Sequence, residues 1–221
     1  MPKGGHGPDE YEDAFAGVPA AGRFAVADGA SESSFARTWA DLLVHGFTAH
    51  TGPWSRWLPA ARQSWQEAIQ DRTFSWYAED KFLQGAHATF LGVSIQEANL
   101  RWRAVAIGDS CLFQVRDHRL LRAFPMRRSG AFGNQPDLIG SRKSSKKVRR
   151  LHWHADWQKE DRLLLMTDAM AQWFLKQTEN HRQPWEDVLS VATQTDFESW
   201  ISTLRESNEL RNDDVTVMIV G

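Results

Sequence analysis

Four aspartates lie at the ends of segments that have the composition of buried strands. They are Asp28 in FAVADGA, Asp109 in AVAIGDS, Asp168 in LLLMTDAMAQWFL and Asp213 in NDDVTVMIVG. A side chain at such a position can leave the rigid edge of a sheet and enter a cleft, so the four carboxylates could converge. Two carboxylates about 4 Å apart repel by about 4 kcal/mol at an effective dielectric of 20. A converging set therefore requires a positive partner.

The residue types available narrow the choice of that partner. The chain has no matching cluster of Arg or Lys at these strand ends, and no Cys and His set with the spacing of zinc ligands. Carboxylate oxygens are the ligands that Mg²⁺ and Mn²⁺ prefer. Spacing alone leaves open the alternative that the four acids are unrelated turn and cap residues, because Asp is favoured in turns.

The length and composition of the chain indicate its number of domains and the classes of partner that it could bind. The 221 residues are 42% hydrophobic and 24% charged, which predicts one domain over 1–221 rather than two small ones. A net charge of -2 excludes a global basic field for nucleic acid or an acidic membrane. The single cysteine, Cys111, excludes an internal disulfide and is expected to be buried. Without a signal-peptide core or about 20 consecutive apolar residues, the chain is expected to be cytoplasmic, and by default a monomer.

The first half of the chain predicts a strand, helices and a strand-rich segment. RFAVADG has the composition of a strand, and apolar residues at steps of three and four predict an amphipathic helix from Phe35 to Phe47. A second helix is expected over 54–70, with Pro59 near its first turn or at a break, and a short third over 74–84. From Gly85 the period changes to two, and HATFLGVSI, LRWRAVAIGDS, CLFQVRD and RLLRAF predict an antiparallel meander with turns at QEAN, GDS and DH.

The second half predicts the remaining layers. Residues 125–150 are polar and basic with no period, which indicates a loop or flap. DRLLLMTDA is a further strand that leads into a helix, and helices are expected at about 184–193 and 196–207 before DVTVMIVG closes the chain as a strand. Antiparallel strands that bracket pairs of helices predict an α+β layered fold of two packed sheets with helices outside.

Six stretches, taken in order, resemble the motifs of the metal-dependent protein phosphatases of the 2C type. They are EYEDAF, VADGAS, GAHATF, AIGDSCLF, LLLMTDAMAQWF and NDDVTVMIV. The family motifs read approximately N-E-D or N-Q-D, D-G-x-G-G, G-D-S-R, T/S-D-G-x-x-D and D-N-x-T, and FGNQPDLIG resembles a segment of short bacterial members. The resemblance spans nearly the whole chain. It implies a four-layer αββα sandwich of mainly antiparallel sheets with a two-metal site at one end.

Roles at the two metals are implied by the same resemblance, position by position. Asp28 corresponds to the acid that bridges both ions, and the carbonyl of Gly29 to the backbone oxygen that helps to bind one of them. Asp168 and Asp213 correspond to the acids that hold the other ion. Asp109 corresponds to an acid that can reach a third, weaker metal.

The resemblance also implies an acid pair that binds or orients the water at the metals. Near this pair in the sequence, the chain departs from the family motif. Glu12 and Asp13 correspond to the pair that binds or orients that water. Pro8 stands where the family has a phosphate-binding arginine, four residues before Glu12. His6 is the candidate replacement, and His6 and His87 are candidates for a general acid at the leaving oxygen. An ordinary exposed or core histidine is the alternative for each.

Further departures lie within the metal motifs. Ser31 and Glu32 replace the second glycine pair, and Ala169 replaces the glycine after the fourth acid. Gln172 stands where the family has its last Asp, which puts the third metal in doubt. Asp214 replaces the asparagine of D-N-x-T.

The basic run from Arg142 to Arg150 contains six of the 26 Lys and Arg residues. One interpretation is a substrate flap, with Arg142 and Lys143 binding an anionic phosphopeptide. The alternative is a solvated surface loop. Nucleic-acid binding is disfavoured because the rest of the chain is not basic and no stacking aromatic residues interrupt the run.

Together with the acids at the strand ends, the resemblance implies a hydrolase that uses two Mn²⁺ or Mg²⁺ ions to activate a water against phosphoserine or phosphothreonine in protein. Such a scheme needs no nucleophilic cysteine. One alternative is a catalytically weak or inactive phosphatase-like module that binds phosphoproteins or ligands for regulation. Another is a small-molecule phosphatase on the same fold.

Overall fold

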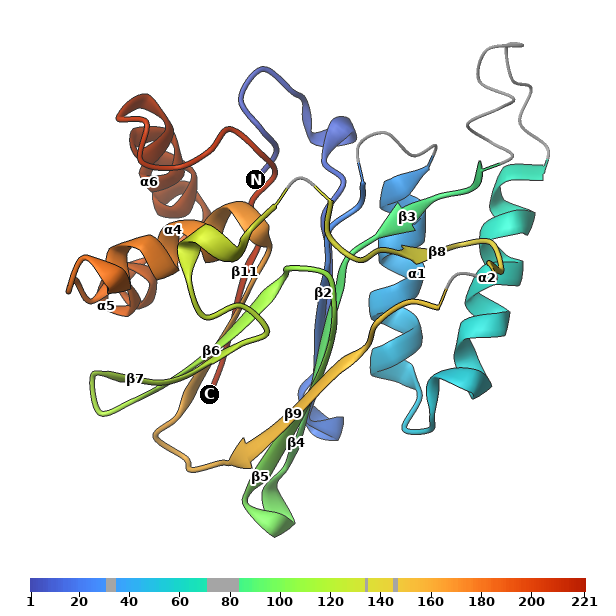
Figure 1. The fold of residues 1–221 in the computed structure, drawn as a ribbon, viewed down its shortest axis with the longest axis horizontal. Helices are drawn as coiled ribbons and strands as arrows, with labels where there is room; N and C mark the ends of the chain where they lie inside the picture. Colours follow the sequence, from blue (N-terminus) through green and yellow to red (C-terminus); the bar gives the residue numbers. More distant parts are fainter. Residues whose placement is uncertain (31–34, 71–83, 134, 145–146) are drawn as a thin grey trace.

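Two antiparallel sheets form the centre of the molecule (Figure 1). The computed structural model describes residues 1–30, 35–70, 84–133, 135–144 and 147–221. The first sheet has the order β1-β2-β4-β5-β9, with β1 (Ala14–Val18), β2 (Arg23–Ala27), β4 (Phe90–Gln96), β5 (Arg101–Ile107) and β9 (Leu151–Asp156). The second has the order β11-β10-β6-β7, with β6 (Cys111–Arg116), β7 (Arg119–Phe124), β10 (Arg162–Met166) and β11 (Val217–Val220). A two-stranded sheet joins β3 (His87–Ala88) to β8 (Ile139–Gly140).

Helices cover the outer face of each sheet. The first sheet is covered by α1 (Ala36–Ala49) and α2 (Trp54–Gln70), and the second by α4 (Asp168–Glu179), α5 (Pro184–Ser190) and α6 (Gln194–Glu206) (Figure 1). Short 3-10 turns are η1 (Pro8–Glu10), η2 (Pro19–Ala21), η3 (Glu97–Asn99) and η4 (Ser129–Ala131). The predicted four-layer αββα sandwich is therefore confirmed.

Strand β10 explains why the run before Asp168 is continuously apolar. Leu163 and Leu165 point into the core between the two sheets, whereas Leu164 and Met166 point into the core between the second sheet and its helices. A strand covered on both faces needs apolar residues at every position rather than at alternate ones. All four side chains are fully buried.

The predicted meander over 85–124 is wrong at one point. β4 pairs with β5 and β6 pairs with β7, but β5 and β6 belong to different sheets, so the chain crosses between sheets at 108–110. Gly108 makes the corner at φ +89°, and a Cβ there would lie 2.8 Å from the carbonyl oxygen of Asp137. A period of two is common to hairpins and to such crossings, so the pattern could not separate them.

The other predicted elements fall close to the observed ones. The helix over 54–70 is α2, which continues through Pro59. The helix expected over 74–84 lies almost wholly in 71–83, outside the described residues. The loop 125–150 contains only η4 and β8 as regular elements among its described residues. Within the described part of the chain, no helix combines the length and apolarity needed to cross a membrane.

Candidate metal centre

The strand register of the first sheet brings three predicted acids to one end. Asp13 directly precedes β1 and Asp28 directly follows β2, and these two strand ends are paired through Ala14 and Ala27. β5 ends at Ile107, which pairs with the first residue of β4, so Asp109 leaves the sheet near the same edge.

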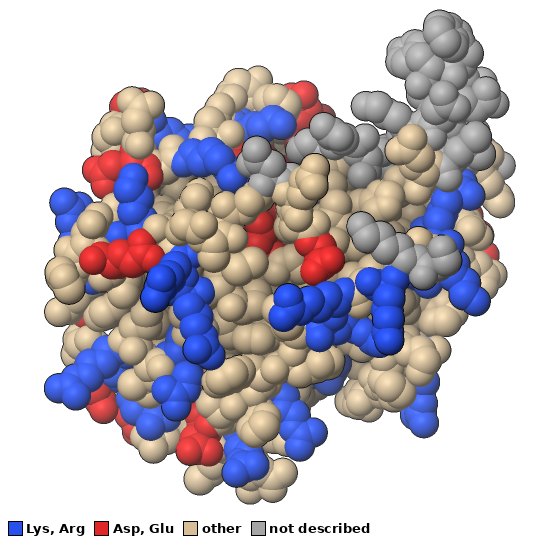
Figure 2. All heavy atoms as spheres, in the orientation of Figure 1, with Lys and Arg blue, Asp and Glu red and all other residues tan. Residues whose placement is uncertain are grey.

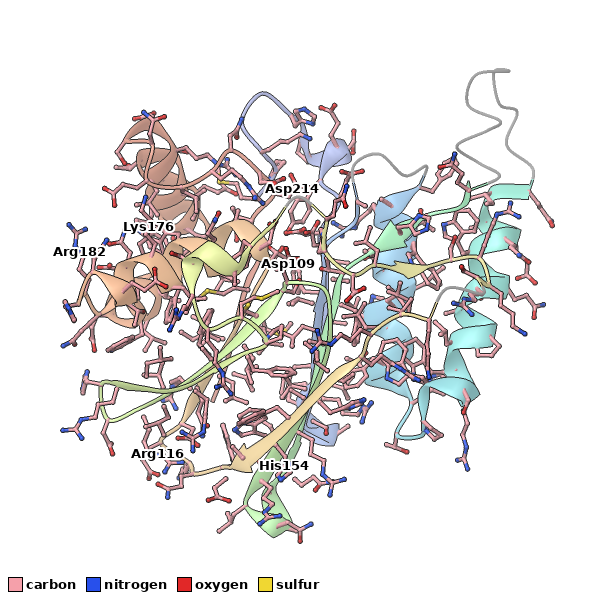
Figure 3. All side chains as sticks on the ribbon, viewed as in Figure 1. Asp109, Arg116, His154, Lys176, Arg182 and Asp214 are labelled. Atoms are coloured by element: carbon pink, nitrogen blue, oxygen red, sulfur yellow. The ribbon has the colours of Figure 1, made fainter. Side chains whose placement is uncertain are left out.

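The second sheet adds two acids at the same end. Met166, the last residue of β10, pairs with both Cys111 at the start of β6 and Val217 at the start of β11. Asp168, two residues after Met166, and Asp213, in the loop before β11, therefore lie near Asp109. Figure 3 shows Asp109 and Asp214 at this end of the sheets, and Figure 2 shows acidic side chains in the middle of the drawn face. We call Asp13, Asp28, Asp109, Asp168 and Asp213 the acidic cluster.

Asp28 is the electrostatic centre of the acidic cluster. Burial raises the pKa of its carboxyl well above the ordinary value, and the like charges of the other four cluster acids each raise it further. A carboxylate in this setting is poorly solvated and repelled by its neighbours, so a bound cation would stabilise its charged form. The expected role of Asp28 as the acid that bridges two ions stays a prediction.

Asp13 is held rigidly by two threonines. Its Oδ2 accepts hydrogen bonds from Thr167 Oγ1 at 2.9 Å and Thr216 Oγ1 at 2.7 Å, while the side chain is fully buried. Among the described residues, the buried Oδ1 of Asp13 has no hydrogen-bond partner. Burial raises the pKa of Asp13 to about 7, against the effect of the threonines. The carboxyl thus has one fixed oxygen and one oxygen free for a ligand.

Asp109, like Asp13, is a buried carboxylate with an oxygen that lacks a hydrogen-bond partner in the described part of the chain. It is 2% exposed, and its buried Oδ1 has no hydrogen-bond partner among the described residues. Burial, with the charge of Asp168, raises its pKa to about 7. Neighbouring Cys111 is buried, and burial raises the pKa of its thiol, so the predicted buried cysteine is confirmed.

Asp214 has a structural role that the sequence did not indicate. Its two oxygens accept hydrogen bonds from the backbone amides of Lys3 at 2.8 Å and Glu12 at 2.6 Å. The second acid of NDDV therefore ties the N-terminal segment to the loop that carries Asp213. His6 lies in this segment and pairs with Glu10, with 3.4 Å between Nδ1 and Oε1.

Gly29 is required by close packing. A Cβ at this position would lie 2.8 Å from the carbonyl oxygen of Glu12 and 2.9 Å from the Cβ of Ala36. Gly29 also forms an isolated bridge with Ala88, the last residue of β3. Glycine thus allows the segments of Glu12 and Asp28 to approach each other, as the predicted site needs.

Arg211 is a cation of this site that the sequence analysis overlooked. Its Nη2 contacts Oδ2 of Asp168 and lies 2.9 Å from Oδ2 of Asp213. Burial disfavours the charged guanidinium, but the two carboxylates outweigh burial and hold the pKa of Arg211 above its ordinary value. The sequence predicted no matching cluster of Arg or Lys at the strand ends, and Arg211 is a single cation that this prediction did not consider. Arg211 lies two residues before Asp213 in an irregular loop, and no periodicity shows where such a side chain points.

Comparison with known families agrees with this geometry. A sequence profile of the family described as Protein phosphatase 2C matches residues 9–205. The chain belongs to the protein phosphatase 2C family. The match covers every member of the acidic cluster except Asp213. A search of curated proteins found no significant match.

Solved structures of phosphatases in this family share the fold. The Mycobacterium tuberculosis serine/threonine phosphatase PstP/Ppp is 14% identical with a TM-score of 0.64, over 99% of this chain and 94% of that chain. PppA of Pseudomonas aeruginosa, a key regulatory component of T6SS, is 18% identical with a TM-score of 0.59, over 95% and 90%. The catalytic domain of PstP in complex with 2 manganese ions is 17% identical with a TM-score of 0.58, over 98% and 93%. At these identities the likeness establishes the fold.

Whether the acidic cluster could bind a pair of divalent ions depends on its donor atoms. The cluster offers carboxylate oxygens only, and two of its buried oxygens have no partner, which suits hard cations. Within the described ranges, however, no group of three or more Asp, Glu, His or Cys side chains is arranged to hold a metal ion as it stands. Arg211 takes Oδ2 of Asp168 and Asp213, and their Oδ1 atoms accept the backbone amides of Ala169 and Asp214. The residues of the acidic cluster therefore fit divalent ions in donor type and in charge.

Two pockets are lined by residues next to the segments that carry the acidic cluster. One, of about 950 Å³, is lined by His87, Arg142, Lys143 and Lys147 among others, so the predicted substrate-binding residues share one cavity wall. The carbonyl of His87 accepts the amide of Ala30, which connects this wall to the segment after Asp28.

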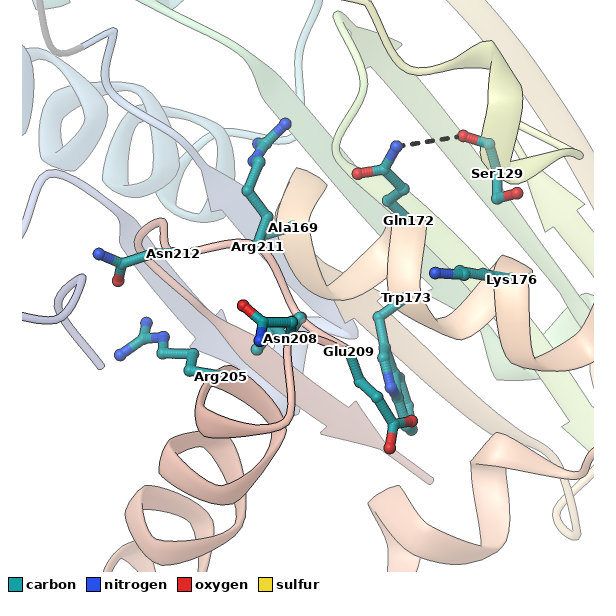
Figure 4. Close-up of a pocket in the computed structure, with 11 residues that line it drawn as sticks. Ser129, Ala169, Gln172, Trp173, Lys176, Arg205, Asn208, Glu209, Arg211 and Asn212 are labelled. Atoms are coloured by element: carbon teal, nitrogen blue, oxygen red, sulfur yellow. Dashed lines mark hydrogen bonds between the residues drawn. The ribbon is translucent and has the colours of Figure 1, made fainter.

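The other pocket, of about 400 Å³, lies between α4 and the loop before β11, and no pattern in the sequence predicted it (Figure 4). It is lined by Gln172, Lys176, Arg205, Glu209 and Arg211 among others. Gln172 donates from Nε2 to the carbonyl of Ser129 at 3.3 Å, as the dashed line in Figure 4 marks.

Proposed function

We propose that this chain is a metal-dependent serine/threonine protein phosphatase that hydrolyses phosphomonoesters with a water activated by two Mn²⁺ or Mg²⁺ ions. The observation that carries the proposal is the acidic cluster itself. Five aspartates from separate segments converge at one end of the sandwich, and two of their buried oxygens have no partner among the described residues. Acids held together against their mutual repulsion are typical of a site that binds a cation.

The acids would share the ions between them. Asp28 and the carbonyl of Gly29 would hold one ion, and Asp28, Asp168 and Asp213 the other. Bound there, two divalent ions lower the pKa of a water and neutralise charge on the phosphoryl group. The oxygen-only donor set and the 2 manganese ions of the PstP complex support this assignment.

The chain's own residues would prepare that water and the leaving group. Thr167 and Thr216 fix one oxygen of Asp13, so the other can accept a hydrogen bond from water in a defined direction. With a pKa of about 7, Asp13 can also take a proton at neutral pH. Glu12 would orient the same water. His6 and His87 remain the candidates for the acid at the leaving oxygen.

Substrate would approach along the basic wall of the larger pocket. Arg142 and Lys143 line that pocket together with His87, whose strand adjoins the segment of Asp28. A phosphoprotein is the partner that suits these cations, rather than nucleic acid or a membrane. We propose that residues 1–221 act as one domain, with 125–150 as its flap, and as a monomer in the cytoplasm.

A second candidate function is a regulatory module with little or no turnover. The observation that favours it is Arg211, which already neutralises Asp168 and Asp213 without any metal. A module of this kind would bind phosphoprotein at the basic wall and leave it intact.

Hydrolysis of p-nitrophenyl phosphate and of a phosphothreonine peptide decides between the two. We expect turnover with millimolar Mn²⁺ or Mg²⁺ and none with EDTA. We also expect a rise in thermal stability with metal, about 2.7 kcal/mol at 100 times the dissociation constant. Unchanged melting and absent hydrolysis with both ions would refute the metal-dependent phosphatase and leave the regulatory module.

A further inference from the structure

Arg211 and a divalent ion compete for the same atoms. The guanidinium Nη2 donates to Oδ2 of Asp168 and Oδ2 of Asp213, the side-chain oxygens that a metal between these acids would use. Their Oδ1 atoms accept backbone amides, which leaves Oδ2 as the more available oxygen of each carboxylate. A guanidinium and a divalent ion would not share the position between these two oxygens, because the two cations would repel each other at such a short distance.

The guanidinium has room to leave. The side chain of Arg211 is 42% exposed, compared with 17% for Asp168 and 37% for Asp213. It lines the pocket of about 400 Å³ between α4 and the loop before β11, and Figure 4 shows it projecting from that loop. Rotation of exposed side-chain bonds would carry the charge away from the acids without movement of a strand or helix.

A displaced Arg211 would remain beside the reaction site with its charge uncompensated. The pocket it lines contains two other cations, Lys176 and Arg205, and one acid, Glu209. Glu209 already accepts a hydrogen bond from Gln177 at 3.1 Å and lies 4.0 Å from Arg182. Glu209 thus has two neighbours at its Oε2 already, whereas a bound phosphate group would offer the freed guanidinium two oxygens in the bidentate arrangement that arginine favours.

We propose that Arg211 is an exchangeable cation that pairs with Asp168 and Asp213 before metal binds, leaves when a divalent ion takes its place, and then donates to the substrate phosphate. The proposal rests on the proposed two-metal function. In it, one residue stabilises the metal-free acids and also binds substrate. Arg211 becomes a catalytic residue only in the metal-loaded protein.

Two binding measurements with the Arg211→Gln variant test the exchange without any turnover. Calorimetric titration with Mn²⁺ should give roughly tenfold tighter binding at one site than in the unmodified protein, because no internal cation competes. Titration of inorganic phosphate into the Mn²⁺-loaded variant should give roughly tenfold weaker binding. A merely structural Arg211 would weaken both, so opposite signs are the signature of exchange.

Arg182→Gln is the matched control, because Arg182 is an exposed arginine near the same pocket that pairs with Glu209 rather than with the acidic cluster. It should change neither affinity. Arg211→Lys keeps the charge and loses the fork, so it should retain weak competition with Mn²⁺ and bind phosphate less tightly. The Lys variant also supplies the comparison if the Gln variant does not fold.

Each result has a distinct reading. Mn²⁺ affinity that is unchanged or weaker in Arg211→Gln overturns the exchange, and phosphate affinity that is unchanged overturns the substrate role. An unmodified protein that binds no Mn²⁺ overturns both this proposal and the two-metal function. If Mn²⁺ and phosphate bind with the expected opposite shifts but no phosphomonoester is hydrolysed, the exchange stands and the phosphatase function fails.

Discussion

Strand β10 has an aspartate near each end, and the negative charges of the two carboxylates are compensated to different degrees. Asp161 directly precedes the strand and has a fully buried side chain. Arg116 donates to both of its oxygens at 2.6 and 2.9 Å, and Gln114 Nε2 and the amide of Gln158 add bonds of 2.8 Å each. Asp168 lies just beyond the other end of the strand. It pairs with Arg211, but the negative charge of Asp213 in the acidic cluster also repels it. Figure 3 shows Arg116 far from Asp109, at the opposite end of the sheets.

The pKa values of Asp161 and Asp168 reflect this difference in their partners. Burial alone would raise the pKa of Asp161, but Arg116, Gln158 and Gln114 outweigh it and hold the pKa below its ordinary value. At the cluster end, burial raises the pKa of Asp168, and its pairing with Arg211 does not reverse the shift. Permanent partners make a buried carboxylate part of the fold. Missing partners leave it available to an exchangeable ligand.

The sharpest test of this contrast is Asp28→Asn. It should lower turnover by about a thousandfold, equivalent to about 4 kcal/mol, because Asp28 would contact both ions. The same change should stabilise the metal-free protein, since it removes a charge that four other acids repel. Asp156→Asn, at an exposed acid 3.9 Å from Arg101, is the control and should do neither. Near-normal hydrolysis by Asp28→Asn would show that the acidic cluster is not the reaction site.

Asp161→Ala, at the end of β10 away from the acidic cluster, should lower stability and leave turnover unchanged. Removal of one member of a buried pair leaves the other uncompensated, so unfolding in urea should show a loss of about 3 kcal/mol. Turnover per folded molecule should stay the same. Arg116→Gln should reproduce the loss in part. If Asp161→Ala unfolds at the same urea concentration as the unmodified protein, the division into a structural and a functional end is wrong.

A pH series distinguishes the two ends in one molecule. Burial raises the pKa of Asp13 and Asp109 from 3.8 to about 7, so the folded protein keeps protons that the unfolded chain has released. Metal-free stability should therefore fall as pH rises from about 4 to about 7. The lowered pKa of Asp161 has the opposite sign, and its contribution should be lost as pH falls below about 4.

Thermal melts in EDTA across this range provide the measurement. Asp13→Asn should flatten the slope between about pH 4 and 7, because the amide does not titrate. A slope that is unchanged in Asp13→Asn would assign the pH dependence to other groups.

The smallest expected effect is at Gln172. A neutral amide adds no charge beside Asp109, so two well-occupied ions are expected, with a third weak or absent. Gln172→Asp, one helical turn after Asp168, should restore the third site and shift the Mn²⁺ dependence of activity by roughly threefold, about 0.6 kcal/mol. Gln66→Asp, on the exposed side of α2, is the control. Three full Mn²⁺ anomalous peaks in the unmodified protein, one of them at Asp109, would contradict this view.

The parts that could be predicted from sequence depend on local patterns. The apolar run before Asp168 and the helical spacing after it are properties of neighbouring residues, so β10 and α4 were foreseen. The parts that were missed depend on contacts over long separations or on the path of a side chain. The β5–β6 crossing depends on which sheet each strand joins. The ties of Asp214 to Lys3 and Glu12 span 211 and 202 positions, and the reach of Arg211 depends on a loop without periodicity.

The threonine bonds to Asp13 also set an order of events during synthesis. The two hydrogen bonds to Asp13 cannot form until Thr167 and Thr216 have been synthesised, and these residues lie 154 and 203 positions later in the chain. At about 5–20 residues per second, the second partner reaches the ribosome exit roughly 10–40 s after the first acid. Contacts of such high sequence separation form late in folding. A nascent chain that has not yet reached Thr216 would therefore lack the assembled acidic cluster.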